Sequence, residues 1–251
     1  MMPTLEARRL TLSWDGGATI VARDVSLSVS EGQTVCLVGR SGCGKTTILH
    51  ALSGLSKPLE GQVLLQNEDV TGIPGRVSYM LQKDLLMPHL RILENAALPL
   101  VLGGMAKAEA HERARALFDR FGLAGTEEAW PSELSGGMRQ RAAFLRTYLM
   151  GNKAVLLDEP FSALDALTRV ELRRWYARMA EELGIASVVI THDVDEAVSL
   201  ASRVYVLRGT PSAGVPSQIV AEVKVPRTQE EGFELTHAYV DCKRAIMDEL
   251  G

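Results

Sequence analysis

The run from Gly39 to Thr46 constrains the fold of this chain more than any other feature, because it fits the pattern G-x-x-x-x-G-K-[ST]. An apolar, β-branched run at 33–38 predicts a strand before it, and the apolar spacing of 46–52 predicts a helix after it. Such a loop points backbone N–H groups at phosphate, where the helix dipole also favours an anion. The residues expected to hold a nucleotide are consecutive: Gly39, Arg40, Ser41, Gly42, Cys43, Gly44, Lys45, Thr46 and Thr47.

Paired carboxylates end another apolar run, in which residues 155–157 are followed by Asp158, Glu159 and Pro160. The carboxyl end of a strand is the edge where α/β sheets bind ligands. We expect Asp158 and the Thr46 hydroxyl to hold Mg²⁺, while Lys45 reaches the β- and γ-phosphates. Glu159 is then the candidate base that orients or deprotonates the attacking water.

Three further side chains suit the same site. His192 directly follows an apolar run at 187–191, and Gln82 follows another at 77–81, so both are expected at the same sheet edge. His192 is a candidate for contact with the γ-phosphate or the attacking water, and Gln82 for contact with the metal or the water. Trp14 precedes a glycine-rich turn, where an aromatic ring either packs in the core or stacks on adenine.

A second glycine-rich turn, Ser135-Gly136-Gly137, needs its own explanation because the chain already carries a complete phosphate loop. It also precedes a helical run, so it presents a helix N-terminus. Basic residues occur beside it and again further along the chain, at Arg139, Arg141, Arg146, Arg169, Arg173 and Arg174. Such groups are usually solvated helix faces, although those beside the turn can hold the helix in place or meet phosphate.

Composition narrows the class of protein. The chain has 251 residues, of which 46% are hydrophobic, enough for a large core. Its longest apolar runs fall short of the roughly 20 residues that cross a bilayer, and its N-terminus lacks a signal-peptide core, which predicts a cytoplasmic protein. A formal net charge of −4 gives no overall footprint for nucleic acid.

The cysteines predict reduced thiols, because Cys36, Cys43 and Cys242 are odd in number and widely spaced. Cys36 is interpreted as strand packing. Cys43 lies inside the phosphate loop, so we expect its alkylation to block nucleotide binding.

The order of the expected elements favours an α/β fold. Strand patterns at 5–14, 19–21 and 25–29 predict an antiparallel β layer. Further short strands are expected at 62–65 and 77–81, and residues 95–149 predict a helical insert broken at 122–126 and 130–131. Strands at 154–157, 187–191 and 204–207 alternate with helices at 166–183 and 194–201, as in a parallel sheet with crossover helices. A strand at 219–225 and a helix from about 230 to 249 complete the chain.

In this order the motifs resemble those of ATP-binding cassette (ABC) ATPases over roughly residues 5–225. The run Leu134-Ser135-Gly136-Gly137-Met138 before the acidic strand is more specific than the phosphate loop, which many NTPases share. The resemblance implies a P-loop NTPase (RecA-like) parallel-sheet core with an N-terminal antiparallel β layer. It implies an ATPase domain at 1–225 with a helical subdomain at about 83–150, and a C-terminal helical tail at 226–251.

The resemblance also implies ATP and Mg²⁺ as cofactors and a head-to-tail dimer. In such a dimer, ATP lies between the phosphate loop of one copy and the turn Ser135, Gly136 and Gly137 of the other. Glu159 becomes the catalytic base, His192 supports the transition state, and Gln82 follows Mg²⁺ and contacts a membrane partner. Asp165 lies at the dimer seam, and Trp14 stacks on adenine.

The partners implied are a second copy, transmembrane permease subunits and, indirectly, a solute-binding protein, at the cytoplasmic side of the membrane and without nucleic acid. Met138 stands where glutamine commonly follows LSGG. This variant and residues 79–88 resemble ATPases of bacterial importers for nitrate, sulfonates, taurine and pyrimidine thiamine precursors. The leading hypothesis is an importer subunit that hydrolyses ATP to drive uptake of a small polar solute.

Two other classes are open. Soluble ABC ATPases that act on nucleic acid or ribosomes share these motifs but carry coiled coils, zinc modules or two cassettes in one chain. A nucleotide-binding module without catalysis fits poorly, because Glu159 and His192 are both present.

Overall fold

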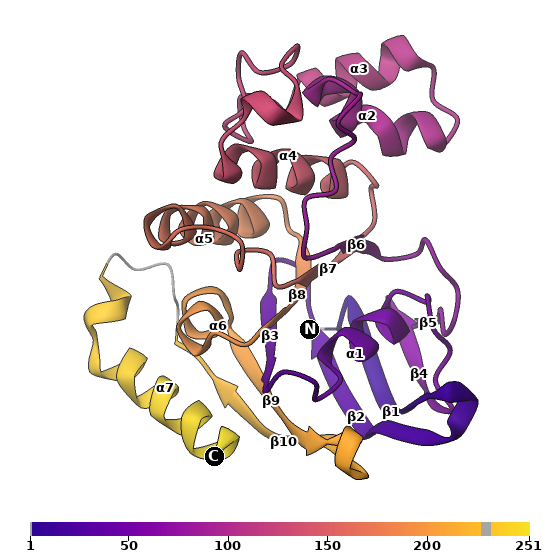
Figure 1. Ribbon diagram of the computed structural model, residues 1–251, viewed down its shortest axis with the longest axis vertical. Coiled ribbons are helices and arrows are strands. Elements are labelled where there is room, and N and C mark those ends of the chain that lie inside the picture. The colour runs from indigo at the N-terminus through magenta and orange to yellow at the C-terminus, as the bar shows by residue number, and fades with distance from the viewer. Residues whose placement is uncertain (1, 227–231) are drawn as a thin grey trace.

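The computed structural model describes residues 2–226 and 232–251 (Figure 1). Its strands are β1 (Leu5–Trp14), β2 (Thr19–Val29), β3 (Thr34–Gly39), β4 (Glu60–Leu65), β5 (Glu68–Asp69), β6 (Ser78–Met80), β7 (Ala154–Asp158), β8 (Ala186–Thr191), β9 (Arg203–Thr210) and β10 (Val215–Lys224). Its α-helices are α1 (Lys45–Leu52), α2 (Ile92–Leu102), α3 (Lys107–Arg115), α4 (Gly136–Tyr148), α5 (Ala166–Glu182), α6 (Val194–Leu200) and α7 (His237–Leu250).

The strands form one curled sheet in the order β5-β4-β1-β2-β10-β9-β3-β8-β7-β6. Strands β9, β3, β8, β7 and β6 are parallel, whereas β1, β2, β4 and β5 pair antiparallel. Strand β10 joins the two parts, because it runs antiparallel to β9 and meets β2 through the pair Ser217 and Ala22. The predicted fold class is confirmed, and the antiparallel layer is continuous with the core sheet.

Helix α1 packs between the two parts of this sheet (Figure 1). Its Ile48 and Leu49 are fully buried in a cluster that takes Leu10 from β1, Leu37 from β3 and Leu156 from β7. Burial of an aliphatic side chain of this size contributes about 1.5–3 kcal/mol. The phosphate loop between β3 and α1 is therefore held at both ends by core packing.

A second buried cluster covers the other face of the parallel strands and extends into α2, α3 and α4. Phe144 of α4 stacks on Tyr176 of α5 with a centroid distance of 4.8 Å, and it also contacts Phe161 at 5.9 Å. Gln140 of α4 donates a hydrogen bond to the carbonyl of Pro160. These contacts fix α4 against the segment that directly follows the acidic end of β7.

The element boundaries differ from the sequence-based expectation at several points. Strand β2 is continuous through Asp24, which adopts φ 53° and shifts the register with β1 instead of ending the strand. The tail helix begins at His237, where the Thr236 hydroxyl caps it by accepting from the amide of Tyr239 at 3.3 Å. Part of the expected start of that helix, at 230–231, lies outside the described residues.

In the described part of the chain, no helix combines the length and the apolar character needed to cross a membrane.

Candidate nucleotide site

The phosphate loop begins at Gly39, the last residue of β3, and ends at Gly44, the N-cap of α1. Gly44 has φ 95°, and a Cβ there would lie 2.5 Å from Val21, so both conformation and space require glycine. Lys45 is buried, and its ammonium donates to the carbonyls of Gly39 at 2.8 Å and Arg40 at 3.2 Å. The loop thus wraps around the lysine head group.

The other residues of the loop differ in exposure. Arg40, Ser41, Gly42 and Thr46 are exposed, and Thr47 is half-buried. The Cys43 thiol is only 2% exposed and belongs to the same buried cluster as α1, so burial raises the pKa of that thiol. The sequence led us to expect that alkylation of Cys43 blocks nucleotide binding; in the structure its side chain is buried in the core, so a reagent has little access to it.

Asp158, the last residue of β7, lies beside the start of α1. Its Oδ2 accepts hydrogen bonds from the Thr46 hydroxyl at 3.4 Å and from the Tyr79 hydroxyl at 3.2 Å. Burial raises the pKa of Asp158, although the hydrogen bonds from Tyr79 and Thr46 act in the opposite direction. A hydroxyl and a carboxylate are oxygen donors of the kind that Mg²⁺ prefers, and a cation there would offset the burial of the charge.

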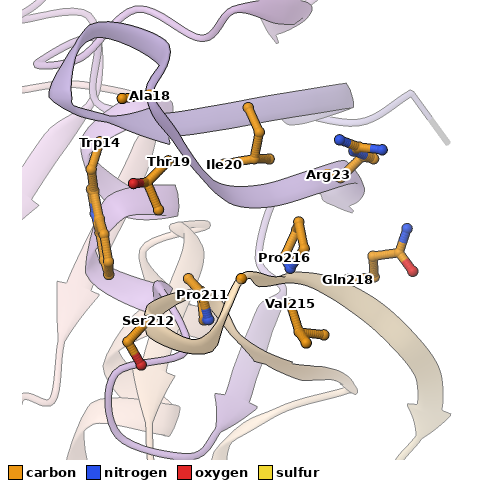
Figure 2. Close-up of a pocket in the computed structure, with 11 residues that line it drawn as sticks. Trp14, Ala18, Thr19, Ile20, Arg23, Pro211, Ser212, Val215, Pro216 and Gln218 are labelled. Carbon is orange, nitrogen blue, oxygen red and sulfur yellow. The ribbon is translucent and has the colours of Figure 1, made fainter.

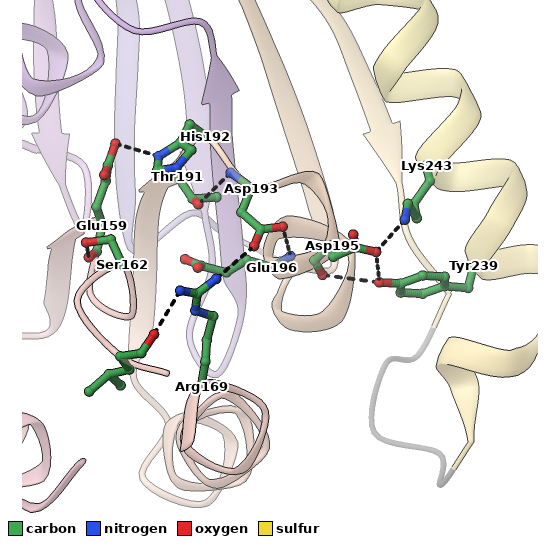
Figure 3. Close-up of polar contacts among 11 residues, drawn as sticks. Glu159, Ser162, Arg169, Thr191, His192, Asp193, Asp195, Glu196, Tyr239 and Lys243 are labelled. Atoms are coloured by element: carbon green, nitrogen blue, oxygen red, sulfur yellow. Dashed lines mark hydrogen bonds and ion pairs between the residues drawn. The ribbon is translucent and has the colours of Figure 1, made fainter. Parts of the chain in front are cut away.

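Glu159 contacts both Gln82 and His192, and Figure 3 shows the contact with His192. Its Oε1 lies 3.1 Å from Nδ1 of His192, and its Oε2 accepts from Nε2 of Gln82 at 3.3 Å. The backbone of Glu159 has φ 44°, and its amide donates to the carbonyl of Ile190 at 3.0 Å. Since this conformation is unfavourable for a side chain with a Cβ, the neighbouring strand must hold Glu159 in it.

Trp14 is partly exposed, at 38%, rather than packed in the core. Its indole Nε1 donates to the hydroxyl of Thr47 at 3.3 Å, which ties the end of β1 to the first turn of α1. Trp14 also lines one end of an open groove of about 830 Å³ between β2 and residues 211–218 (Figure 2). The ring is available for a ligand that binds the phosphate loop.

The turn Ser135-Gly136-Gly137 lies at the start of α4, where the Ser135 hydroxyl caps the helix by accepting from the amide of Met138 at 3.3 Å. A Cβ at Gly137 would lie 2.9 Å from Thr168, so the turn packs against the first turn of α5. Asp165, which is exposed, caps α5 by accepting from the amide of Thr168 at 3.1 Å. Among the described residues, no hydrogen bond joins this turn to residues 39–46.

One site residue, Tyr79, was not identified as such from the sequence, and one of the basic residues beside the glycine-rich turn now has a definite contact. Tyr79, which contacts Asp158, is one residue of a short strand, and its register beside Leu156 of β7 appears only once the strands are paired. Arg139 donates to the carbonyl of Leu134 at 2.7 Å. The arginines near the glycine-rich turn therefore include one that holds the turn in place.

Helix α6, which begins two residues after His192, carries a buried acid. Glu196 is 3% exposed, and its Oε1 has no hydrogen-bond partner among the described residues. Burial raises the pKa of Glu196 to about 7, and the nearby charge of Asp193 adds to the effect, while Arg173 and Arg169 oppose it. The helix that follows His192 thus carries a buried carboxyl group whose ionised form is unfavourable.

The chain is similar to known protein families, proteins and solved structures. The family model described as "ABC transporter" matches residues 22–162. The formylaminopyrimidine import ATP-binding protein ThiZ of Halalkalibacterium halodurans is 37% identical over 246 residues, covering 98% of this chain and 94% of that protein. The nitrate import ATP-binding protein NrtC of Synechococcus elongatus is 37% identical over 237 residues, covering 94% of this chain and 36% of that protein.

Among solved structures, the dimeric structure of MJ0796, a bacterial ABC transporter cassette, matches with a TM-score of 0.73 and 28% identity. The match covers 89% of this chain and 99% of that chain.

Proposed function

Since the chain belongs to the ABC transporter family of ATP-binding proteins, we propose that it is the ATP-hydrolysing subunit of a bacterial importer. In this proposal it drives uptake of a small polar solute of the sulfonate, nitrate, taurine or thiamine-precursor type through a separate permease. Two relatives, named for formylaminopyrimidine import and nitrate import, support the import direction and the solute class. Nothing in the site or in these relatives favours the nucleic-acid alternative.

The observation that carries the proposal is the cluster of Glu159, His192 and Gln82 beside the pair Thr46 and Asp158. We assign the nucleotide phosphates to residues 39–47 and the adenine to Trp14. Thr46 and Asp158 would hold Mg²⁺, with Gln82 nearby. When bound, Mg²⁺ neutralises charge that develops on the β- and γ-phosphate oxygens.

In the proposed mechanism, Glu159 accepts a proton from the attacking water, because its half-buried carboxylate lies at the open edge of the sheet. The amide of Gln82 donates to one carboxylate oxygen and the Nδ1 side of His192 faces the other, so the carboxylate has a fixed orientation. Because Nδ1 faces Glu159, Nε2 of His192 is left for a contact with the γ-phosphate.

The role of Ser135, Gly136 and Gly137 requires a second copy of the chain. We infer that two copies pack head to tail, so that this turn and Asp165 of one copy complete the ATP site of the other. The solved dimer of a related cassette supports this inference. The remaining partners are a transmembrane permease, which places the subunit at the cytoplasmic face of the membrane, and, through the permease, a solute-binding protein.

The direct test is ATP hydrolysis by the wild type and by Glu159→Gln, with the exposed Glu109→Gln of α3 as the matched control. We expect vanadate-sensitive hydrolysis in the wild type and in the control. Glu159→Gln should bind ATP with normal affinity but hydrolyse it about 10²–10⁴-fold more slowly, the range for loss of a general base. Undiminished turnover in Glu159→Gln would remove the assigned base.

A further inference from the structure

One arginine connects two loops of the proposed catalytic machinery. We call residues 162–165 the seam loop, because it ends at Asp165, and residues 191–193 the histidine loop. Arg169, in the first turn of α5, donates from one terminal nitrogen to the carbonyl of Leu164 at 2.9 Å. Its other terminal nitrogen lies 3.7 Å from Oδ2 of Asp193, the residue after His192 (Figure 3).

The far end of this connection is itself fixed. Asp193 caps α6 by accepting from the amide of Glu196 at 3.1 Å, and its own amide donates to the Thr191 hydroxyl at 3.0 Å. Asp193 therefore cannot move without disturbing the start of α6 and the end of β8. Its neighbour His192 faces Glu159 at 3.1 Å, so a displacement of Asp193 reaches the catalytic carboxylate through one side chain.

Arginine suits this position because its planar guanidinium can donate to two acceptors at once. The Arg169 and Asp193 side chains are 31% and 29% exposed, so solvent weakens their attraction less than that of a fully exposed pair. At the near end, the seam loop adjoins the glycine-rich turn of α4, since Gly136 packs against Leu164. Arg169 thus connects the seam loop, which we expect to meet a second copy of the chain, with the histidine loop of the active site.

We propose that Arg169 is a positioning residue that couples the seam loop to His192, so that closure of two copies keeps the histidine in its place beside Glu159. The inference rests on the proposed function. A chain without Arg169 still binds the nucleotide, because none of the contacts that Arg169 makes involves residues 39–47. ATP hydrolysis becomes slow, because the position of the histidine loop no longer depends on that of the seam loop.

The test is Arg169→Met, with Arg174→Met as the matched control. Arg174 lies on the same helix and pairs instead with Glu234, at 3.2 Å. We expect Arg169→Met to lower kcat at least about tenfold, as small misplacements of catalytic groups do, while KM and the Kd for ATP stay within about twofold. The control should keep both values. A kcat equal to that of the wild type, or a loss that lies wholly in ATP affinity, overturns the proposal.

A double-mutant cycle with Asp193→Asn separates coupling from general damage. Asparagine still caps α6 but removes the charge that faces Arg169. If the two residues act as one connection, the double variant should be no slower than the slower single variant; losses that multiply overturn the coupling. Should Arg169→Met fail to fold, Arg169→Lys carries the same test, because lysine keeps the charge without the fork.

The two proposals fail differently. A wild-type chain that binds ATP without hydrolysing it refutes the proposed function. A wild type that hydrolyses ATP, together with an Arg169→Met variant that does so equally well, refutes only the coupling.

Discussion

Replacing Glu196 by glutamine should stabilise the protein above neutral pH and leave its stability unchanged in acid. Burial raises the pKa of Glu196 from 4.5 to about 7. When the pKa of a carboxyl is higher in the folded than in the unfolded state, its protonated form makes the folded state more stable than its ionised form does. That contribution is complete below pH 4.5, is lost between pH 4.5 and 7, and stays lost above pH 7. Glutamine does not ionise, so the variant avoids the loss.

The size of the effect follows from the shift in pKa. Each unit corresponds to about 1.36 kcal/mol, so a rise from 4.5 to about 7 gives roughly 3 kcal/mol at pH 8. In a domain of this length 1 kcal/mol moves Tm by about 2–4 °C, which predicts a gain of about 6–12 °C for Glu196→Gln at that pH. At pH 4.5 the two proteins should unfold together.

Urea unfolding of the wild type and Glu196→Gln at a series of pH values from 4.5 to 8 measures this difference directly. The exposed Glu109→Gln of α3 removes the same charge without the burial, so its curve should parallel that of the wild type. A gap between wild type and Glu196→Gln that does not widen with pH would show that Glu196 is solvated or paired in solution, and the reasoning from burial would fail.

Three further perturbations test other parts of the structure. Cys43 should react slowly with iodoacetamide in the folded protein and rapidly in urea, as followed by mass spectrometry, because its thiol is buried; fast labelling of the folded chain contradicts the packing. Gly54→Ala should lower the free energy of unfolding in a urea titration by at least about 2 kcal/mol, since Gly54 has φ 77° and a Cβ would lie 2.3 Å from the Ile73 carbonyl oxygen. Gly75, at φ 82°, has open space around it, so Gly75→Ala should lower the same free energy by only about 1 kcal/mol. Ser135→Arg should bind ATP normally as a monomer yet not hydrolyse it, as shown by nucleotide binding and phosphate release; persistent hydrolysis would place Ser135 outside the site.

The sequence was sufficient for the architecture and for the side chains that follow strands. Gln82, Glu159 and His192 each follow a parallel strand, and the carboxyl ends of such strands meet at one edge, so their proximity could be predicted from order alone. The confirmed fold class rests on the same alternation of strands and helices. The assigned roles of these residues remain proposals.

The contacts that could not be predicted depend on packing between distant segments. The register of β6 on β7 brings Tyr79 to Asp158, and no local pattern encodes that register. The side chain of Cys43 packs in the same buried cluster as Ile48 and Leu49 of α1, whereas the loop carbonyl of Gly39 accepts from Lys45. The sequence indicated that Arg169 is part of a solvated basic face, and only the packing of α5 beside α6 brings it to Asp193.

The separation of Ser135 from its own phosphate loop also has a genetic consequence under the proposed head-to-tail packing. A chain with Ser135→Arg keeps Glu159, and a chain with Glu159→Gln keeps its glycine-rich turn. Each variant alone forms dimers in which both sites are defective. A mixed dimer instead combines the intact phosphate-loop half of the first with the intact turn of the second and rebuilds one complete site. Two inactive alleles of this gene, expressed together, should therefore complement each other in the same cell.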